Sequence, residues 1–482
     1  MRLFLSCLSL LLLAAVSAVQ AVSVSGSRLL AVFDDASDQA NYSKFLGDLK
    51  DRGFSITSET AKSSSVALFR LGERAYDHVI FFPTKAKGLG PNLTPQLLVQ
   101  FLNAKGNILV ALSSGQAASS SITSLLSELD IALPAERTGL VVDHFAFDAR
   151  SAADLHDVVL LPVPGPESAR PGTKALFGGG DDAAASGALI AFPRGVGHVL
   201  GDSALLAPIL SAPRTAYSYN PKEQGDAVSG DGNADNELFA AGAQLKLVSA
   251  LQARNSARLA LLGSAELLSD KWFDATVQLP RDGAKAVPTY NREFARRLAG
   301  WTFQETGVLR VNWVEHHLNE VGAANASNPK IYRIKNDVTY TISLSEYAWD
   351  KWTPFVLPAG DEIQLEFSML SPFHRLPLHA VPSESTADAT AYSVSFTLPD
   401  QHGIFNFLVN YKRPFLTYIE EKMTVSVRHM AHDEWPRSFA ISGAWPWITG
   451  IGATITGWLA FCALWMYSKP VGGQVPAGKK TQ

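Results

Sequence analysis

Cysteine is almost absent from this sequence of 482 residues, which holds only Cys7 and Cys462. Each lies in an apolar stretch close to one end of the chain. The long region between them has no thiol, which excludes disulfides, cysteine nucleophiles and thiolate metal sites there. We therefore expect this region to be stabilised by large hydrophobic cores.

An excess of charge of one sign is also missing. The chain has 41 Lys and Arg against 45 Asp and Glu, a formal net charge of -4, and charged residues make up 18% of it. This balance gives neither the basic footprint of a nucleic-acid-binding protein nor an acidic solvating tail. At about 100 to 200 residues per domain, the length allows two or three globular domains.

The first 21 residues have the pattern of a secretory signal peptide. Arg2 precedes an apolar run, Leu3 to Val16, that is interrupted only by Ser6 and Ser9, and small residues follow around Ala18 and Ala21. A short basic start, an apolar core too short to span a membrane and a small-residue cleavage site are typical of such peptides. The alternative is a buried N-terminal helix, but no amphipathic pattern marks a face to bury.

Residues 441–468 predict a transmembrane helix. Ala444 to Tyr467 has no charged side chain, and at about 1.5 Å per residue it can cross a hydrocarbon core of about 30 Å. Tryptophan lies at both ends and Tyr467 at the second end, and only basic charged residues follow, which predicts a cytoplasmic tail at 469–482. Together with a signal peptide, this predicts a single-pass type I protein with residues 22–440 in the lumen. The alternative is a buried core helix.

The first part of the lumenal region alternates between two kinds of segment. Apolar runs of strand length are Arg28–Phe33, Phe54–Thr57, His78–Phe82 and Asn107–Leu112, and segments with helical spacing are Asn41–Arg52, Thr94–Ala104 and Ser121–Leu129. This alternation predicts an α/β domain over residues 22–150, with a parallel sheet covered by helices on both faces. Further apolar runs of strand length predict a second α/β region over residues 151–306; they are Val158–Leu161, Leu189–Phe192, His198–Leu200 and Arg258–Leu262.

The pattern changes from about Val308. Short segments rich in β-branched and aromatic residues alternate with period two, and turn signals separate them. These segments are Lys330–Leu344, Glu362–Leu370, Tyr392–Leu398, Gly403–Asn410 and Lys422–Arg428. We expect a membrane-proximal antiparallel β-sandwich over residues 307–440.

Asp34 and Asp35 are the best-placed polar pair. They follow the first predicted strand, where open α/β sheets usually bind ligands, so they could line a crevice. The alternative is that aspartates simply end strands and cap the next turn. Ser113, Ser114 and Gly115 follow a later strand but lack the G-x-S-x-G pattern, which argues against acyl transfer.

A metal site is not favoured at Glu315, His316 and His317. Neighbouring residues of a strand point to opposite faces, and the chain has no H-E-x-x-H sequence. The sequence thus indicates no metal ligand set and no cofactor-binding residue.

Three sequons predict N-glycosylation sites at Asn41, Asn92 and Asn325. Pro95 follows the second sequon directly, which argues against its use. In the predicted span, Thr449, Ala453 and Gly457 fall four residues apart on one helix face. Such small residues allow a second helix to approach closely, so we expect this face to pack on a partner subunit. The alternative is that glycine is merely common in membrane helices.

Several stretches of the lumenal region resemble one known family. They are RLLAVFDD (Arg28–Asp35), GDLKDRGFSIT (Gly47–Thr57), YDHVIFFPTKAKGLG (Tyr76–Gly90), GNILVALSS (Gly106–Ser114) and TGLVVDHFAFD (Thr138–Asp148). They look like the wheat-germ-agglutinin-binding-protein (Wbp) family, a non-catalytic subunit of the oligosaccharyltransferase. The resemblance covers nearly the whole mature chain. In addition, Lys479 and Lys480 resemble a dilysine signal for retrieval to the endoplasmic reticulum.

The resemblance implies a flavodoxin-like or glutamine-amidotransferase-like first domain without a catalytic cysteine. It also implies membership of the complex that transfers an oligosaccharide from dolichyl diphosphate to asparagine of N-x-S/T. The family assigns that transfer to a separate multi-span STT-type subunit. This chain would be an accessory subunit of the endoplasmic-reticulum membrane, without a cofactor of its own. It would contact that subunit, a Swp-type (ribophorin II) subunit and a small Dad-type subunit, and could help to hold lipid-linked oligosaccharide.

Two other functions remain open from the residues alone. The chain could be a lumenal glycan-processing enzyme that uses Asp34, Asp35 and His144, or a glycan-binding protein that acts on its own through the same crevice. A glycosyltransferase of the dolichyl type needs carboxylates and a divalent cation beside a lipid donor. The predicted single span has no such carboxylate cluster beside it in the sequence, which favours an accessory role.

Overall fold

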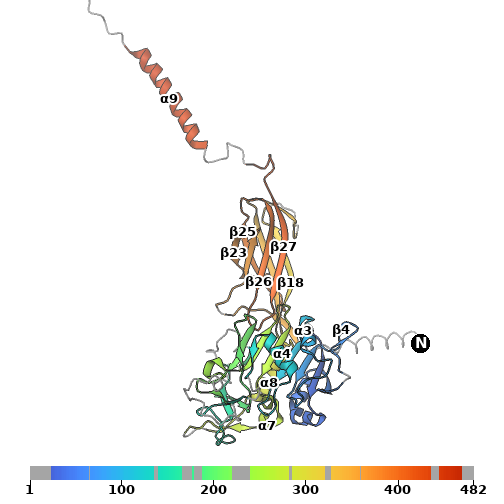
Figure 1. Cartoon of the computed structure of the whole chain (residues 1–482). Coiled ribbons are helices and arrows are strands. Elements are labelled where there is room, and N and C mark those ends of the chain that lie inside the picture. Colours follow the sequence, from blue (N-terminus) through green and yellow to red (C-terminus); the bar gives the residue numbers. More distant parts are fainter. Residues whose placement is uncertain are drawn as a thin grey trace, which may run out of the picture.

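The computed structural model describes residues 23–63, 66–134, 139–164, 176–178, 187–219, 239–281, 285–320, 327–358, 360–435 and 444–468. The predicted signal peptide, residues 1–21, lies outside these ranges. We call residues 23–305 the α/β region and residues 306–435 the β-region. Figure 1 shows the β-region as an elongated body that extends from one end of the α/β region.

A seven-stranded mixed sheet, in the order β12-β14-β15-β6-β5-β1-β2, forms the centre of the α/β region. The five strands from β15 to β2 are parallel, as the apolar runs predicted. The two edge strands β14 and β12 are antiparallel, which the sequence did not predict. A tight turn joins β14 to β15, where the Ala253 amide donates to the Ala257 carbonyl, so these two strands can only pair antiparallel. The strands are β1 (Arg28–Phe33), β2 (Ser55–Thr60), β5 (His78–Phe81), β6 (Asn107–Ala111), β12 (Leu206–Ser211), β14 (Lys246–Gln252) and β15 (Arg258–Leu262).

Helices cover both faces of this sheet because alternate residues of each strand point to opposite sides. From β1, Leu29 and Ala31 join the core under α2 (Ser43–Asp51) and α8 (Asn291–Thr302). Leu30 and Val32 join the core under α3 (Pro95–Asn103) and α4 (Ser120–Glu128) on the other side. The predicted helices are confirmed, except that residues 36–42 form the 3-10 helix η1 (Ala36–Tyr42) before α2 begins.

The remaining strands of the α/β region form small antiparallel pairs outside the main sheet. Predicted strands at 158–161, 189–192 and 198–200 are present, but they belong to these pairs. The pairs are β3 (Phe69–Arg70) with β4 (Glu73–Arg74), β7 (Ile131–Ala132) with β11 (Val199–Leu200), β8 (Leu140–Val142) with β13 (Tyr217–Tyr219), β9 (Val158–Pro162) with β10 (Leu189–Pro193), and β16 (Thr276–Val277) with β17 (Val287–Pro288). Short helices η3 (Gly242–Gln244), η4 (Ala265–Leu268) and α7 (Asp270–Phe273) connect some of them.

The β-region consists of two five-stranded sheets that share one core. The first contains β18 (Thr306–Leu318), β20 (Asp337–Ala348), β21 (Lys351–Pro354), β24 (His379–Ala380) and β25 (Thr390–Thr397). The second contains β19 (Ile331–Arg333), β22 (Gln364–Ser368), β23 (Pro372–Pro377), β26 (Gly403–Tyr411) and β27 (Ile419–Arg428). Tyr340 and Ile342 of β20 meet Phe405 and Phe407 of β26 in this core. The predicted antiparallel strands are therefore confirmed, and β19, which pairs parallel with β27, is the exception among the described pairs.

Direct contacts join the two regions. The indole Nε1 of Trp301 in α8 donates to the Phe415 carbonyl in the loop before β27, at 2.8 Å. Gln252, at the end of β14, donates to the Leu416 carbonyl of the same loop. Since these side chains are buried, we expect the α/β region and the β-region to move as one body.

The last described element is α9 (Trp445–Tyr467), a helix of 23 residues. It is the one helix within the described ranges that is long and apolar enough to cross a membrane. None of its residues is buried against the rest of the chain, which fits a helix whose apolar surface meets lipid or another protein.

Candidate functional site

Asp34 and Asp35 follow β1 directly, at the carboxyl edge of the parallel strands. At this place the strand order reverses, because β2 lies on one side of β1 and β5 on the other. Open α/β sheets usually bind ligands at such a point. The structure thus places the two predicted crevice residues at the expected edge, with Asp34 half-buried and Asp35 exposed.

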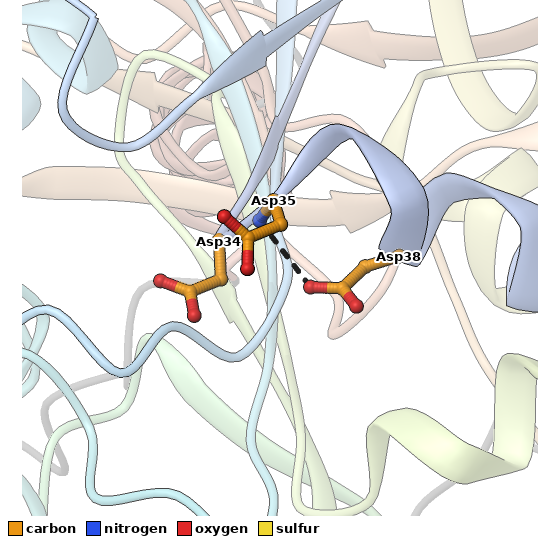
Figure 2. Close-up of side chains that lie close together, drawn as sticks. All are labelled: Asp34, Asp35 and Asp38. Carbon is orange, nitrogen blue, oxygen red and sulfur yellow. Dashed lines mark hydrogen bonds between the residues drawn. The ribbon is translucent and has the colours of Figure 1, made fainter.

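Asp38 joins these two residues, as Figure 2 shows. Potential ligand atoms of Asp34, Asp35 and Asp38 all lie within 4.8 Å of one another. The Asp35 amide donates to Asp38 Oδ2 at 3.3 Å, and the Asp38 amide donates to the Asp35 carbonyl at 3.1 Å. Asp35 and Asp38 therefore cap the N-terminal end of η1. Oxygen ligands suit a hard cation, but within the described ranges no other His, Cys, Asp or Glu joins the group.

A narrow pocket opens beside this edge, at the carboxyl ends of β5 and β6. Its walls include Phe82, Thr84, Ser113, Gln116 and Ser119. The space open to the centre of a water molecule is about 20 Å³, which holds a water but not a sugar ring. The neighbouring Ser114 hydroxyl donates to the Arg194 carbonyl at 2.7 Å, so a carbonyl and not a general base accepts its proton.

Sequence reasoning missed a charged group at the same edge of the sheet. Glu266 lies in η4, just after β15, and its Oε2 accepts from Arg194 Nη2 at 2.5 Å. Tyr42 packs on Phe82, with 4.4 Å between the ring centroids. Burial, with smaller effects of the Glu266 and Asp38 carboxylates, raises the pKa of Tyr42 to about 12. The rule that selected Asp34, a polar residue after a parallel strand, would also have selected Glu266.

His144 does not join the aspartates. Its Nδ1 lies 2.6 Å from His156 Nδ1, and its Nε2 lies 2.9 Å from the Tyr217 hydroxyl. The His156 ring in turn stacks on Phe147, with centroids 3.8 Å apart. His144 and the two aspartates named for a glycan-processing enzyme therefore have separate sets of partners, and the described contacts do not form a proton-transfer chain from His144 to Asp34 or Asp35.

The adjacent Glu315, His316 and His317 point to different sides of β18. His316 is buried, lies 2.6 Å from the Tyr332 hydroxyl through its Nδ1, and stacks on Phe407. Burial lowers its pKa to about 4, so it is neutral at physiological pH. The structure therefore explains His316 as a hydrogen-bonded core residue.

The other predicted sites fall in different parts of the chain. Asn41 is exposed near the end of η1, and Asn92 is half-buried before α3. The sequon residue Thr94 serves as the N-cap of α3, since its Oγ1 accepts from the Leu97 amide at 3.4 Å. Asn325, Lys479 and Lys480 lie outside the described residues.

Thr449, Ala453 and Gly457 are exposed on α9. The Thr449 hydroxyl donates to the Trp445 carbonyl at 2.8 Å, so the helix itself satisfies this polar group. A hollow runs along α9 between Trp447 and Ile455, where the small residues Gly450 and Thr454 leave space.

Comparison with known proteins matches most of the chain to two domain families. The OST48 N-terminal domain matches residues 20–305, and the OST48 middle domain matches residues 316–469. A relative from Schizosaccharomyces pombe, dolichyl-diphosphooligosaccharide-protein glycosyltransferase subunit wbp1, is 33% identical over 95% of this chain and 96% of its own.

Two animal relatives are named as the 48 kDa subunit of the same glycosyltransferase. The protein from Danio rerio is 32% identical over 96% of this chain and 96% of its own. The protein from Drosophila melanogaster is 31% identical over 97% of this chain and 98% of its own. Among solved structures, a putative ThuA-like protein from Parabacteroides merdae has 10% identity and covers 57% of this chain and 89% of its own. Its TM-score of 0.28 is too low to support an argument about fold.

Proposed function

Because this chain belongs to the OST48 family, we propose that it is an accessory subunit of the oligosaccharyltransferase. That complex transfers a preassembled oligosaccharide from dolichyl diphosphate to asparagine of N-x-S/T in nascent proteins. The observation that carries the proposal is the family match along both lumenal regions and the apolar helix. Since the match includes nearly the full length of the relatives, the whole architecture is shared and not one module of it.

The geometry of the lumenal regions supports an accessory role over a catalytic one. At the edge of the main sheet, Asp35 and Asp38 are engaged in a helix cap, and the adjoining pocket is too small for a sugar. By contrast, the contacts of Trp301 and Gln252 hold the two regions together. A rigid arm of this kind suits a subunit that positions other subunits.

We propose a flavodoxin-like main sheet and a β-sandwich for the finer fold classes. The parallel strands β2-β1-β5-β6-β15 follow the order 2-1-3-4-5 of flavodoxin-like sheets. The shared core of the two sheets in the β-region supports the sandwich. Strands of the main sheet come from both 22–150 and 151–306, which favours one folded unit over residues 22–306.

For topology, we propose a type I protein of the endoplasmic-reticulum membrane with α9 as its span. Residues 22–440 then lie in the lumen, residues 469–482 form the cytoplasmic tail, and Lys479 and Lys480 form the retrieval signal. The length and composition of α9 support this topology. Asn41 is our first candidate for glycosylation because it is exposed, whereas Thr94 of the Asn92 sequon is engaged in a helix cap.

The partners that we propose are the catalytic STT-type subunit, a Swp-type subunit and a Dad-type subunit. A pull-down in mild detergent tests this, with a tag placed between α9 and the last four residues. We expect a multi-span catalytic partner in the eluate, together with transfer activity on a sequon peptide. The control is the same chain with a stop after residue 440, which should lose the partners that bind through α9. Recovery of the full chain alone, folded and active on a glycan, would overturn the proposal.

A further inference from the structure

The chain leaves the β-region at the end that faces away from the α/β region, as Figure 1 shows. The strand β27 ends there at Arg428, and Trp435 is the last residue of the described range 360–435. We call this end the distal end. Three other segments lie at the distal end: the start of β26 at Gly403, the start of β20 at Asp337, and the turn between β22 and β23. The strand registers align them with the last residues of β27 and β25.

Large apolar side chains are exposed at the distal end. Leu370, in the turn between β22 and β23, is 99% exposed, and Trp435 is 51% exposed. Ile331 and Ile404 are 62% and 63% exposed, and both pair with Ser426 of β27, so they flank one position on the same outer face. A single exposed apolar side chain is ordinary, but several at one end of a domain indicate a contact surface.

The turn that holds Leu370 adjoins the first residue of β26. A Cβ atom placed on Gly403 would lie 2.6 Å from the Met369 sulfur, so the two segments are in contact. Met369 itself packs against the core of the β-region. This leaves Leu370 as the side chain that projects from the turn.

The charges at the distal end largely neutralise one another. Arg428 pairs with Glu434 at 2.8 Å, and Lys335 pairs with Asp400 at 3.0 Å. Arg333 lies 2.8 Å from Glu320. These ion pairs leave no strong field of one sign, so the apolar tips can approach uncharged or zwitterionic headgroups.

The length of the chain limits how far this end can be from the membrane. Nine residue steps separate Trp435 from Ala444, and at about 3.3 to 3.6 Å per residue they span at most about 32 Å. The helix α9 begins at Trp445. Because tryptophan favours the membrane interface, we expect the start of α9 to lie at the level of the interface. The distal end is thus tethered close to the lumenal leaflet whatever path the linker takes.

We propose that the distal end of the β-region rests on the lumenal lipid surface beside α9, with Leu370 and Trp435 in the headgroup layer. This inference depends on the proposed membrane span of α9. Exposed apolar side chains that enter the interface would fix the tilt of the α/β region and the β-region relative to the membrane. A flexible tether alone would leave their orientation free.

A fluorescence experiment on the full chain, purified with its co-purifying subunits, tests the contact. An environment-sensitive NBD probe is attached at Leu370→Cys in a Cys462→Ser background, and the protein is placed in phosphatidylcholine nanodiscs. We expect a blue-shifted emission and strong quenching when part of the lipid carries a nitroxide on its acyl chain near the headgroup. The matched control is Leu71→Cys, which is equally exposed but lies in the α/β region and should show neither effect.

Two outcomes would overturn the inference. Emission as in water at position 370 would show that this end is free in solution. A blue shift without quenching by the labelled lipid would show that a protein partner covers it. Resistance of the unlabelled chain to alkaline extraction from membranes is measured in parallel, so that failure of α9 as a span is recognised separately. A second NBD probe is attached at Ile404→Cys. Quenching of this probe by the labelled lipid should fall several-fold when Leu370→Glu is added to the same chain.

Discussion

Arg52 and Glu305 form a buried ion pair between the end of α2 and the start of β18. Arg52 Nη1 lies 2.5 Å from Glu305 Oε2, and the Glu305 side chain is fully buried. Glu305 Oε1 and Arg52 Nη2 have no hydrogen-bond partner among the described residues. Burial raises the pKa of Glu305 to about 7 against the opposing effect of Arg52, and burial also lowers the pKa of Arg52. The removal of two charges from water thus outweighs their mutual attraction.

The stability of the α/β region and the β-region should consequently fall between about pH 4.5 and pH 7. Since the folded pKa of Glu305 lies above its unfolded value of 4.5, the folded state binds the proton more tightly, and this advantage is lost as pH rises through 7. At about 1.4 kcal/mol per pH unit, the loss is at most about 3.5 kcal/mol. Unfolding of the full chain in urea at pH 5 and pH 7.5 measures it. The variant Glu305→Gln should lose this dependence of unfolding free energy on pH. The control Glu293→Gln, on the surface of α8, should keep it. An unchanged pH dependence in Glu305→Gln would contradict the assignment to Glu305.

At the scale of elements, Arg258 connects β15, α8 and β18. Its Nη1 donates to the carbonyls of Trp301 at 2.6 Å and Thr306 at 2.7 Å, and its Nη2 donates to the Gly307 carbonyl at 2.7 Å. The guanidinium also lies 5.0 Å from the Trp301 ring. Because Arg258 is fully buried, its pKa falls to about 9, and it remains charged at neutral pH. One side chain therefore satisfies three carbonyls at the junction of the two regions.

Replacing Arg258 by methionine should strongly destabilise this junction. Each buried carbonyl that loses its hydrogen-bond donor lowers the free energy of unfolding by about 1 to 3 kcal/mol, so for three carbonyls we expect a decrease of at least about 3 kcal/mol. Thermal unfolding measures the loss, and limited proteolysis should reveal new cleavage near residues 303–308. Arg310→Met changes an exposed arginine of β18 and serves as the control. A melting temperature equal in both variants would refute the role of Arg258.

Two neighbouring rows of small residues on α9 offer space for another helix. Thr449, Ala453 and Gly457 form the face predicted from the sequence, and Gly450 and Thr454 form the hollow found in the structure. Small residues let helix backbones approach closely in lipid, where packing and not the hydrophobic effect drives association.

Larger side chains on the predicted face should release partner subunits. We expect Ala453→Leu with Gly457→Leu to reduce co-purification of partners several-fold in mild detergent, because the added side chains hold the helices apart. Cys462→Leu adds bulk on the opposite face and should have no effect. If Gly450→Leu with Thr454→Leu releases the partners and the first pair does not, then the hollow is the contact face.

At the scale of the whole molecule, the α/β region and the β-region form one arm, which we propose lies in the lumen with its distal end close to α9. The contacts of Arg258, Trp301 and Gln252 make the arm continuous, and the linker of at most about 32 Å keeps its distal end near the membrane. A subunit of this shape can hold partners at a fixed height above the bilayer.

Residues 469–482, which we propose form a cytoplasmic tail, should control the location of unassembled chains. With Lys479→Ser and Lys480→Ser, a chain produced in excess of its partners should leave the endoplasmic reticulum, since the proposed retrieval signal is lost. Conversion of its N-glycans to forms that resist endoglycosidase H measures the escape. Lys469→Ser is the control, because it removes a basic residue outside the signal. Equal sensitivity of all variants would argue against retrieval by the tail.

The sequence by itself determined most elements, because their patterns are local. The apolar run Arg28–Phe33 predicted β1, and the helical spacing of Asn41–Arg52 and Thr94–Ala104 predicted α2 and α3. Alternation after Val308 predicted the β-region, and the uncharged length of residues 445–467 predicted α9. For the candidate site, strand ends located Asp34 and Asp35 at the correct edge of the sheet.

Only the tertiary structure decided which distant residues meet. It added β14 and β12 as antiparallel edges, placed Asp38 and Glu266 beside the strand ends, and separated His144 from the aspartates. It also buried Arg258 among carbonyls of another region and left Leu370 exposed at the distal end. These outcomes depend on strand register and on packing between residues far apart in sequence. Local periodicity does not specify either of them, because the same apolar pattern can be buried against many different partners.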